Sequence, residues 1–277
     1  MSNSSFRKQS VKVLNIILVY IYKKNFRGFW PLLQFYQKIS GQLGLVITTR
    51  FGSYMQLIPS DYIDSHILRE GYYESEIMEA LLPFLGKDTV FWDVGANIGI
   101  HSVTAKYLRP ETIVVAFEPN PLMVERIRSN CELNQLQIQI VELGLSKQSE
   151  NAHLSLIKQG NPGMSTLHPW CGATYDSIIE IRCASADDLV RKGSCPAPTV
   201  IKIDVEGGEA DVIAGLGNLL YLPSLTALIF EAEGILEKAG NEHAIVSQLH
   251  SAGFRIKSLR RKEDTAHNLE NYLATRS

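Results

Sequence analysis

From residue 89 onward, short apolar runs alternate with stretches of helical periodicity, and this alternation limits the possible folds more than any other feature of the chain. Apolar runs of this length are typical of strands buried on both faces, and the amphipathic stretches between them are typical of helices. The predicted strands are 89–94, 113–118, 138–143, 199–204, 226–231 and 254–259, and the predicted helices are 98–108, 121–133, 209–220 and 241–251. Strands that alternate with helices pair in parallel. We therefore expect an α/β fold built on a mostly parallel sheet.

Three other segments have recognisable patterns. Residues 45–49 and 53–58 are short runs of strand-forming residues joined across Arg50-Phe51-Gly52, which predicts a β-hairpin. Residues 74–85 have the apolar spacing of a helix. Residues 144–198 form a less regular insert, and we expect substrate contacts from it because specificity is commonly carried by loops.

The charge is unevenly distributed along the chain. Of 27 basic and 29 acidic side chains, eight basic and no acidic ones lie in residues 1–60, which leaves 19 basic and 29 acidic side chains, a balance of −10, in the remainder. We therefore predict a basic N-terminal extension of helices plus the β-hairpin, residues 1–60, followed by an α/β domain, residues 61–277. Such an extension suits an anionic partner, or docking onto an acidic domain.

Within the extension, residues 13–22 are apolar except for Asn15 and are flanked by lysines. This run is too short to span a bilayer as a helix, which needs about 20 residues, and no small-residue cleavage site of a signal peptide follows it. The aromatic residues that come next suit a basic helix lying on anionic lipid. Packing on the α/β domain, a homodimer through residues 1–60 and peripheral membrane contact are all open alternatives.

The composition is that of an ordinary globular protein, with 277 residues, of which 45% are hydrophobic and 20% charged. A chain of this length can bury a core without disulfide support. The four cysteines, at 131, 171, 183 and 195, form no C-x-x-C pair, so the sequence contains neither a zinc ribbon nor a thioredoxin-type redox site. We expect reduced thiols and a cytoplasmic location, with membrane association as an option through the extension.

The first predicted strand of the α/β part leads into the sequence DVGANIG, which contains Asp93, Gly95, Asn97 and Gly99. Glycines at such a turn permit a tight backbone and the close approach of a ligand. The dinucleotide fingerprint G-x-G-x-x-G would require glycine where Asn97 stands, which weakens a nicotinamide-cofactor interpretation. The second strand ends at Glu118, where a carboxylate can accept hydrogen bonds from both hydroxyls of a ribose.

The strand 199–204 leads into KIDVEGGE, which delivers Asp204, Glu206 and Glu209 to a strand end and the turn after it. Acids this close repel one another unless they are solvated or used. Asp204 is the first candidate for a general base because it ends the strand. Glu206 and Glu209 are further catalytic candidates, although either could instead cap the next helix, whose N-terminus favours negative charge.

Taken together, DVGANIG, FEPNP at 117–121, SADDL at 185–189 and KIDVEGGE resemble the FkbM family of methyltransferases, which depend on S-adenosylmethionine (SAM). The resemblance covers about residues 65–235, and KIDVEGGE is its most specific part. It implies a class I methyltransferase fold, Rossmann-like with a seven-stranded, mostly parallel sheet. It also implies transfer of a methyl group from SAM to a hydroxyl oxygen of a sugar, glycan or natural product.

The resemblance also implies the parts of a SAM site. Asp93, Gly95 and Asn97 would hold the methionine end, Glu118 the ribose, and the turn at Glu142 and Leu143 the adenine. At the start of the next helix, Ser102 would contact the methionine carboxylate, which also gains from the helix N-terminus. Gly99 and Asn120 complete the expected cofactor-binding set.

Alternatives of other classes remain at this point. A non-catalytic SAM-binding or scaffold protein is one, and a NAD-linked dehydrogenase is another. A nucleic-acid substrate is disfavoured because the part that holds the motifs has a balance of −10 and the DVEG sequence is unlike the motif that holds a flipped base. We expect no metal ion, since Ala232 stands where a second oxygen ligand would be needed beside Asp204 and Glu231.

Overall fold

The computed structural model describes residues 3–41, 44–157, 165–166, 175–233, 244–259 and 269–276. Their contacts form two compact units, one that ends at Tyr73 and one that begins at Glu74. The first unit contains α1 (Asn3–Lys23), α2 (Phe29–Ser40), β1 (Leu45–Thr48), β2 (Tyr54–Leu57) and α3 (Tyr62–Glu70). That the extension is a separate domain stays a prediction.

The predicted hairpin is confirmed, because β1 and β2 pair antiparallel with Leu45 opposite Leu57. Asn15, the polar residue within the apolar run of α1, joins α1 to the hairpin. Its amide nitrogen donates to the carbonyl of Val46 at 2.7 Å, and its oxygen accepts the N–H of Val46 at 2.9 Å. Among the described residues, we find no helix with both the length and the apolar character needed to cross a membrane.

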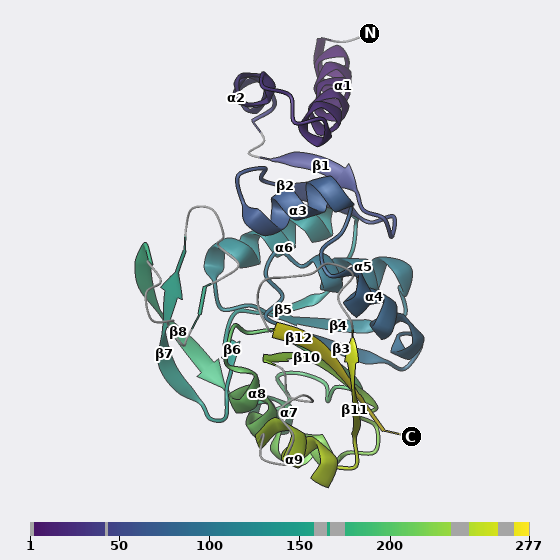
Figure 1. Cartoon of the computed structure of the whole chain (residues 1–277), viewed down its shortest axis with the longest axis vertical. Helices are drawn as coiled ribbons and strands as arrows, with labels where there is room; N and C mark the ends of the chain where they lie inside the picture. The colour runs from purple at the N-terminus through teal and green to yellow at the C-terminus, as the bar shows by residue number, and fades with distance from the viewer. Residues whose placement is uncertain are drawn as a thin grey trace. The chain divides into compact units, whose positions relative to one another are not determined.

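The second unit is built on a seven-stranded sheet with the order β11-β12-β10-β9-β3-β4-β5 (Figure 1). Only the pairings made by β12 are antiparallel, and the remaining pairings are parallel. This order, with one reversed strand beside the edge, is the class I SAM methyltransferase fold, as expected. The strands are β3 (Val90–Val94), β4 (Ile113–Phe117), β5 (Gln139–Val141), β9 (Val200–Ile203), β10 (Ala227–Glu233), β11 (Arg255–Leu259) and β12 (Leu269–Thr275).

Helices cover both faces of this sheet (Figure 1). Along β3, the side chains of Trp92 and Val94 belong to the core that contains residues of α7, α8 and α9, whereas Phe91 points to the opposite face. Strands covered on both faces have no need of polar positions, which explains the continuous apolar runs. The helices are α4 (Ser75–Leu81), α5 (Ile100–Leu108), α6 (Pro121–Leu133), α7 (Ala186–Arg191), α8 (Glu209–Gly215) and α9 (Ala244–Ser251), with 3₁₀ turns η1 (Leu82–Phe84) and η3 (Gly217–Tyr221).

Three features differ from the sequence-based expectations. The helix predicted over 209–220 ends as an α-helix at Gly215, where a Cβ atom would lie 2.1 Å from the carbonyl oxygen of Ser146. The strand β12 was not predicted. The described parts of the insert contain a three-stranded sheet in the order β6-β8-β7. Its strands are β6 (Gly144–Leu145), β7 (Glu150–Leu156) and β8 (Ser177–Ala184).

Candidate functional site

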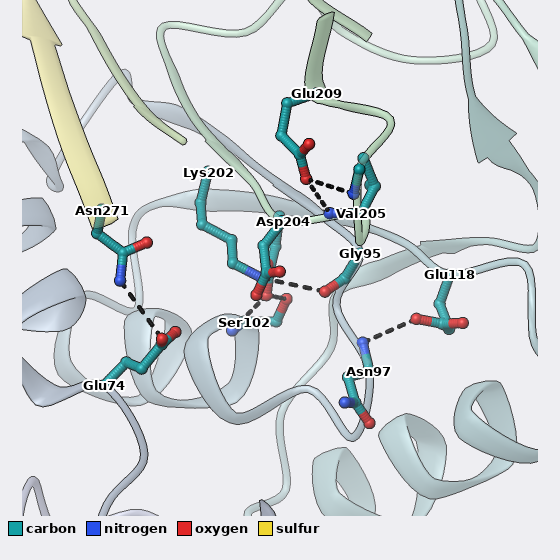
Figure 2. A network of polar contacts seen from close by, with 12 residues as sticks. Glu74, Gly95, Asn97, Ser102, Glu118, Lys202, Asp204, Val205, Glu209 and Asn271 are labelled. Atoms are coloured by element: carbon teal, nitrogen blue, oxygen red, sulfur yellow. Dashed lines mark hydrogen bonds and ion pairs between the residues drawn. The ribbon is translucent and has the colours of Figure 1, made fainter. Parts of the chain in front are cut away.

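The carboxyl ends of the parallel strands bring the predicted acids together. Parallel pairing places Asp93 on β3 beside Lys202 on β9, and β10 continues the register on the other side of β9. Asp204, directly after β9, and Glu231, near the end of β10, therefore lie at the same edge as the turn after β3. Ligands of open α/β sheets bind at this edge. Figure 2 shows the polar contacts that connect it.

The fold of the chain requires a glycine at position 95, whether or not a ligand is bound. It has a φ of +74°, and a Cβ atom at this position would lie 1.8 Å from the carbonyl oxygen of Asp204. The N–H groups of Gly95 and Ala96 both donate to the carbonyl of Phe117 at 3.0 Å. The turn after β3 thus packs directly against the ends of β4 and β9. At Gly99, where φ is +81°, a Cβ would press on Ile127 at 3.2 Å.

Glu118 is buried and is held by two backbone amides. One carboxylate oxygen accepts the N–H of Asn97 and the other accepts the N–H of Asn120, both at 2.8 Å. Burial raises the pKa of Glu118 to about 7, against the opposing effect of these hydrogen bonds. Each oxygen keeps a lone pair for a further donor. The paired hydroxyls of a ribose match that capacity, so the residues present fit the cofactor at this point.

Asn120 has a second contact that fixes the start of α6. Its side-chain oxygen accepts the N–H of Leu122 at 3.1 Å, which is the usual capping contact at a helix N-terminus. Asn97 has a φ of +53°, a conformation that asparagine tolerates better than most residues. Both residues therefore act on Glu118 through their backbones, and their side chains are not needed to hold it.

Asp93 is fully buried, and its contacts are internal. One oxygen accepts the N–H of Ser102 at 3.0 Å and its hydroxyl at 2.5 Å. The other oxygen lies 3.4 Å from Nζ of Lys202 and has no hydrogen-bond partner among the described residues. These contacts fix the first turn of α5 against β3. The expected contacts of Asp93 and Ser102 with the methionine end of SAM stay predictions.

Lys202 lies within the site and was not among the predicted site residues. Its side chain is 3% exposed, and its Nζ lies 3.3 Å from a carboxylate oxygen of Asp204 and donates to the carbonyl of Gly95 at 3.0 Å. Burial alone would lower the pKa of Lys202, but the charges of Asp204, Asp93 and Glu74 outweigh burial and raise it. A lysine inside an otherwise apolar, doubly covered strand was the available signal, because such a charge needs a partner.

The three acids after β9 have different surroundings. Glu209 is buried, and one of its oxygens accepts the N–H groups of Val205 at 3.1 Å and Gly207 at 3.3 Å, so it closes the turn that leads into α8 (Figure 2). The carboxylate of Glu206 has no hydrogen bond or ion pair within the described residues. Its burial and the charges of Asp204 and Glu231, among others, raise its pKa to about 8.

Glu142 and Leu143, the residues predicted to contact the adenine of SAM, directly follow β5, which pairs with β4 on the side away from β3. Glu142 is exposed and contacts Arg128, which also contacts Glu125. Leu143 is half-buried and packs against the core. Neither arrangement assigns a role, so an adenine contact stays a prediction for both residues.

Two more residues lie at the site, although neither belongs to the predicted set of site residues. Glu74, the first residue of the second unit, has a φ of +50° and accepts a hydrogen bond from the Asn271 amide of β12 at 3.4 Å. His101 is buried in α5, where burial and then the charge of Lys202 lower its pKa to about 4. It is therefore neutral at pH 7. Among the described residues, no group of three His, Cys, Asp or Glu side chains is placed to hold a metal ion.

Comparison with known proteins identifies the class. Residues 93–256 match the methyltransferase FkbM domain. The chain is 32% identical over 150 residues to a hexuronic acid methyltransferase of Haloferax volcanii, an alignment that covers 53% of this chain and 58% of that protein. It is 24% identical over 196 residues to the 31-O-demethyl-FK506 methyltransferase of Streptomyces tacrolimicus, which covers 61% of this chain and 73% of that protein.

A solved structure, precorrin-6y C5,15-methyltransferase from Geobacter metallireducens, is similar with a TM-score of 0.44 and 21% identity, and the match covers 73% of this chain and 88% of that chain. The family match identifies a methyltransferase, in place of the dehydrogenase or the scaffold protein that the sequence left open. Because the family model matches more than half of the chain, this protein belongs to the FkbM family of SAM-dependent methyltransferases.

Proposed function

We propose that this protein transfers a methyl group from SAM to a hydroxyl oxygen of a sugar, glycan or natural product. The names of its relatives supply the acceptor classes, a hexuronic acid in one and an O-demethylated natural product in the other. Since the chain matches only 58% of the length of the first relative, the acceptor is a proposal.

The main support for a hydroxyl acceptor is the cluster of acidic side chains at the strand ends. A hexuronic acid offers two kinds of oxygen, a hydroxyl and a carboxylate. A carboxylate acceptor has no proton to lose, and it would be repelled by Asp204, Glu206 and Glu231, whose charges act on one another. A hydroxyl acceptor is neutral, and it must give up a proton when its oxygen receives the methyl group. The site therefore suits a hydroxyl.

We assign the removal of this proton to Glu206. Its carboxylate has no hydrogen bond or ion pair within the part of the chain that the structure describes, and its pKa of about 8 lies close to the working pH, which favours general base catalysis. Asp204 is instead held by Lys202, and Glu209 by two backbone amides. Asp204 then positions the turn and adds negative charge beside Glu206, whereas Glu209 stabilises the turn.

SAM supplies a methyl group that is already activated on a sulfonium. In this protein, Glu118 would bind the ribose hydroxyls through the lone pairs left by the two amide contacts. The acids at the ends of β9 and β10 would favour the positively charged sulfonium in the same region. The remaining task of the site is to align the acceptor oxygen and to receive its proton.

The test is a methyl-transfer assay with isotopically labelled SAM and a panel of hexuronic-acid oligosaccharides and hydroxylated natural products. Glu206→Gln should lower the turnover by about 10²- to 10⁴-fold while SAM binding is kept. Glu209→Gln is the matched control, because Gln keeps the oxygen that accepts the two amides and should retain most of the activity. The wild-type rate should rise with pH up to about 8, where Glu206 becomes ionised.

Three results would contradict the proposal. Methyl ethers survive mild alkali and methyl esters do not, so a labelled product that loses its methyl group in alkali would show that the acceptor is a carboxylate. Equal losses of activity in Glu206→Gln and Glu209→Gln would show that the turn, and not a proton acceptor, is what the reaction needs. SAM binding without methyl transfer to any member of the panel would favour a non-catalytic SAM-binding protein instead.

A further inference from the structure

The helix α1 carries an apolar stripe on its exposed side. Val13, Ile16, Ile17 and Tyr20 follow one another at the spacing of a single helix face, and they are 51%, 67%, 47% and 62% exposed. Single exposed apolar residues are ordinary on a protein surface, but an aligned stripe is typical of a contact surface.

The opposite side of α1 is already used within the N-terminal unit. Leu18 is fully buried, and Asn15 makes two hydrogen bonds to Val46 of the hairpin. The helix therefore cannot rotate to bury its stripe without breaking these contacts. The stripe is a surface of the folded unit, and it is not the result of a loosely placed helix.

Exposed aromatic side chains also lie on and just before the second helix. Phe26, which precedes α2, is 56% exposed, and Trp30 and Phe35 of α2 are 51% and 56% exposed, although Leu33 and Tyr36 of α2 are buried. The two helices are connected by a ring contact between Tyr22 and Phe29, whose centroids lie 4.9 Å apart. Aromatic side chains of this kind are favoured at the boundary between the headgroups and the acyl chains of a membrane.

The charges around the stripe decide what covers it. Lys12, Lys23, Lys24, Arg27 and Lys38 are all exposed on or between the two helices. The first 60 residues contain no acidic side chain. A second copy of this surface would set these cations against identical cations, so electrostatics opposes a homodimer through α1 and α2. A surface with anionic headgroups and an apolar interior matches both the charges and the stripe.

We propose that α1 and α2 bind this protein to anionic lipid surfaces, with the stripe of Val13, Ile16, Ile17 and Tyr20 inserted at the interface and the basic residues on the headgroups. This surface lies outside the methyl-transfer site, and the proposal does not depend on the acceptor. Between two of the alternatives that the sequence left open for the extension, it favours peripheral membrane contact over a homodimer.

The experiment is flotation of the full chain with vesicles of phosphatidylcholine, with and without phosphatidylserine. We expect binding to the anionic vesicles that weakens as salt is raised. Ile16→Glu/Tyr20→Glu should reduce the bound fraction by at least about tenfold. Its matched control is Ile178→Glu/Tyr221→Glu, which changes an isoleucine and a tyrosine that are 63% and 56% exposed in the other unit, and which should bind as the wild type does.

A second variant tests the charges separately. Lys23→Gln/Lys24→Gln/Arg27→Gln should lose about fivefold in binding per charge, about a hundredfold in all, on anionic vesicles only. Absence of wild-type binding to anionic vesicles at low salt would overturn the proposal. So would equal losses in the control variant, or a wild-type dimer that Ile16→Glu/Tyr20→Glu converts to a monomer while vesicles are not bound. Vesicle binding is read without any methyl acceptor, so its failure is separate from failure of the proposed reaction.

Discussion

Lys202→Met is the substitution that tests how the site is held together. Methionine has a similar length and no charge, so it fills much of the same space beneath the strand ends. It removes the ammonium that lies 3.4 Å from Asp93 and 3.3 Å from Asp204 and that donates to the carbonyl of Gly95. The change leaves two carboxylates without a countercharge, one of them fully buried.

The expected loss follows from these distances. At an effective dielectric constant of about 20, unit charges about 3.4 Å apart attract by about 5 kcal/mol. The cost of burying the lysine offsets part of this attraction in the wild type. Removal of one partner from a buried ion pair costs about 3 to 5 kcal/mol, because the remaining charge stays desolvated. We expect a decrease of this size in the free energy of unfolding, a large share of the about 5 to 15 kcal/mol that stabilises a typical domain.

The assay is urea unfolding at several pH values. The raised pKa of Lys202 keeps this residue charged throughout the neutral range, so its contribution in the wild type is constant there and is lost only as pH rises through the folded pKa. In the variant, the stranded carboxylates favour their protonated forms. The deficit of Lys202→Met relative to the wild type should therefore shrink as pH is lowered.

Asp93→Asn completes a double-mutant cycle with Lys202→Met. Adding Asp93→Asn to Lys202→Met should restore part of the lost stability, because asparagine can still accept the hydrogen bonds of Ser102 without a buried charge. A loss of less than about 1 kcal/mol in the free energy of unfolding of Lys202→Met would refute the reasoning, since an exposed ion pair contributes that little. A loss that does not change with pH would refute it as well.

Two further predictions concern Glu118, the proposed ribose contact, and the turn after β3. Ionised Glu118 accepts hydrogen bonds from cofactor hydroxyls better than the protonated form does, and its pKa is about 7. The affinity for SAM, measured by calorimetry, should therefore rise by up to about tenfold per pH unit below pH 7 and level off above it. Glu118→Gln should remove this pH dependence, and a wild-type affinity that does not change with pH would contradict the prediction. Gly95→Ala should lower the free energy of unfolding by more than about 3 kcal/mol, because the new Cβ meets the carbonyl of Asp204. Gly193→Ala, at a φ of +70° with no atom within 4 Å of the new Cβ, should lower it by only about 1 to 2 kcal/mol, as measured by thermal unfolding. Similar losses in both variants would show that backbone strain alone matters.

The regular part of the fold could be predicted because its signals are local. Each buried strand is a short apolar run, and α6 begins and ends at the predicted residues because Asn120 caps it and Pro121 suits its first position. The strand β12 was missed for the opposite reason. It lies between β10 and β11, so its existence depends on pairing with two strands that are distant in sequence, and nothing within Leu269–Thr275 announces that pairing.

The site could be predicted as a region but not as a set of contacts. The rule that ligands bind at strand ends selected Glu118 and Asp204 from the sequence alone. It could not show that Gly95 makes room for the backbone of Asp204, because the two residues are far apart in the chain and meet only through the pairing of β3 with β9. Lys202 was overlooked for the same reason, since its partner Asp93 is defined by that pairing.

The sequence presents the acids of KIDVEGGE as three similar groups, and their surroundings make them different. The carboxylate of Asp204 lies 3.3 Å from the buried ammonium of Lys202 and is paired with it. A carboxylate that accepts two backbone N–H groups, as at Glu209, is fixed in place and has little freedom to follow a substrate. Glu206 has neither kind of partner within the described residues, and its pKa is raised to about 8 by burial and by the charges around it. Of the three, Glu206 is therefore the group that we propose as the proton acceptor.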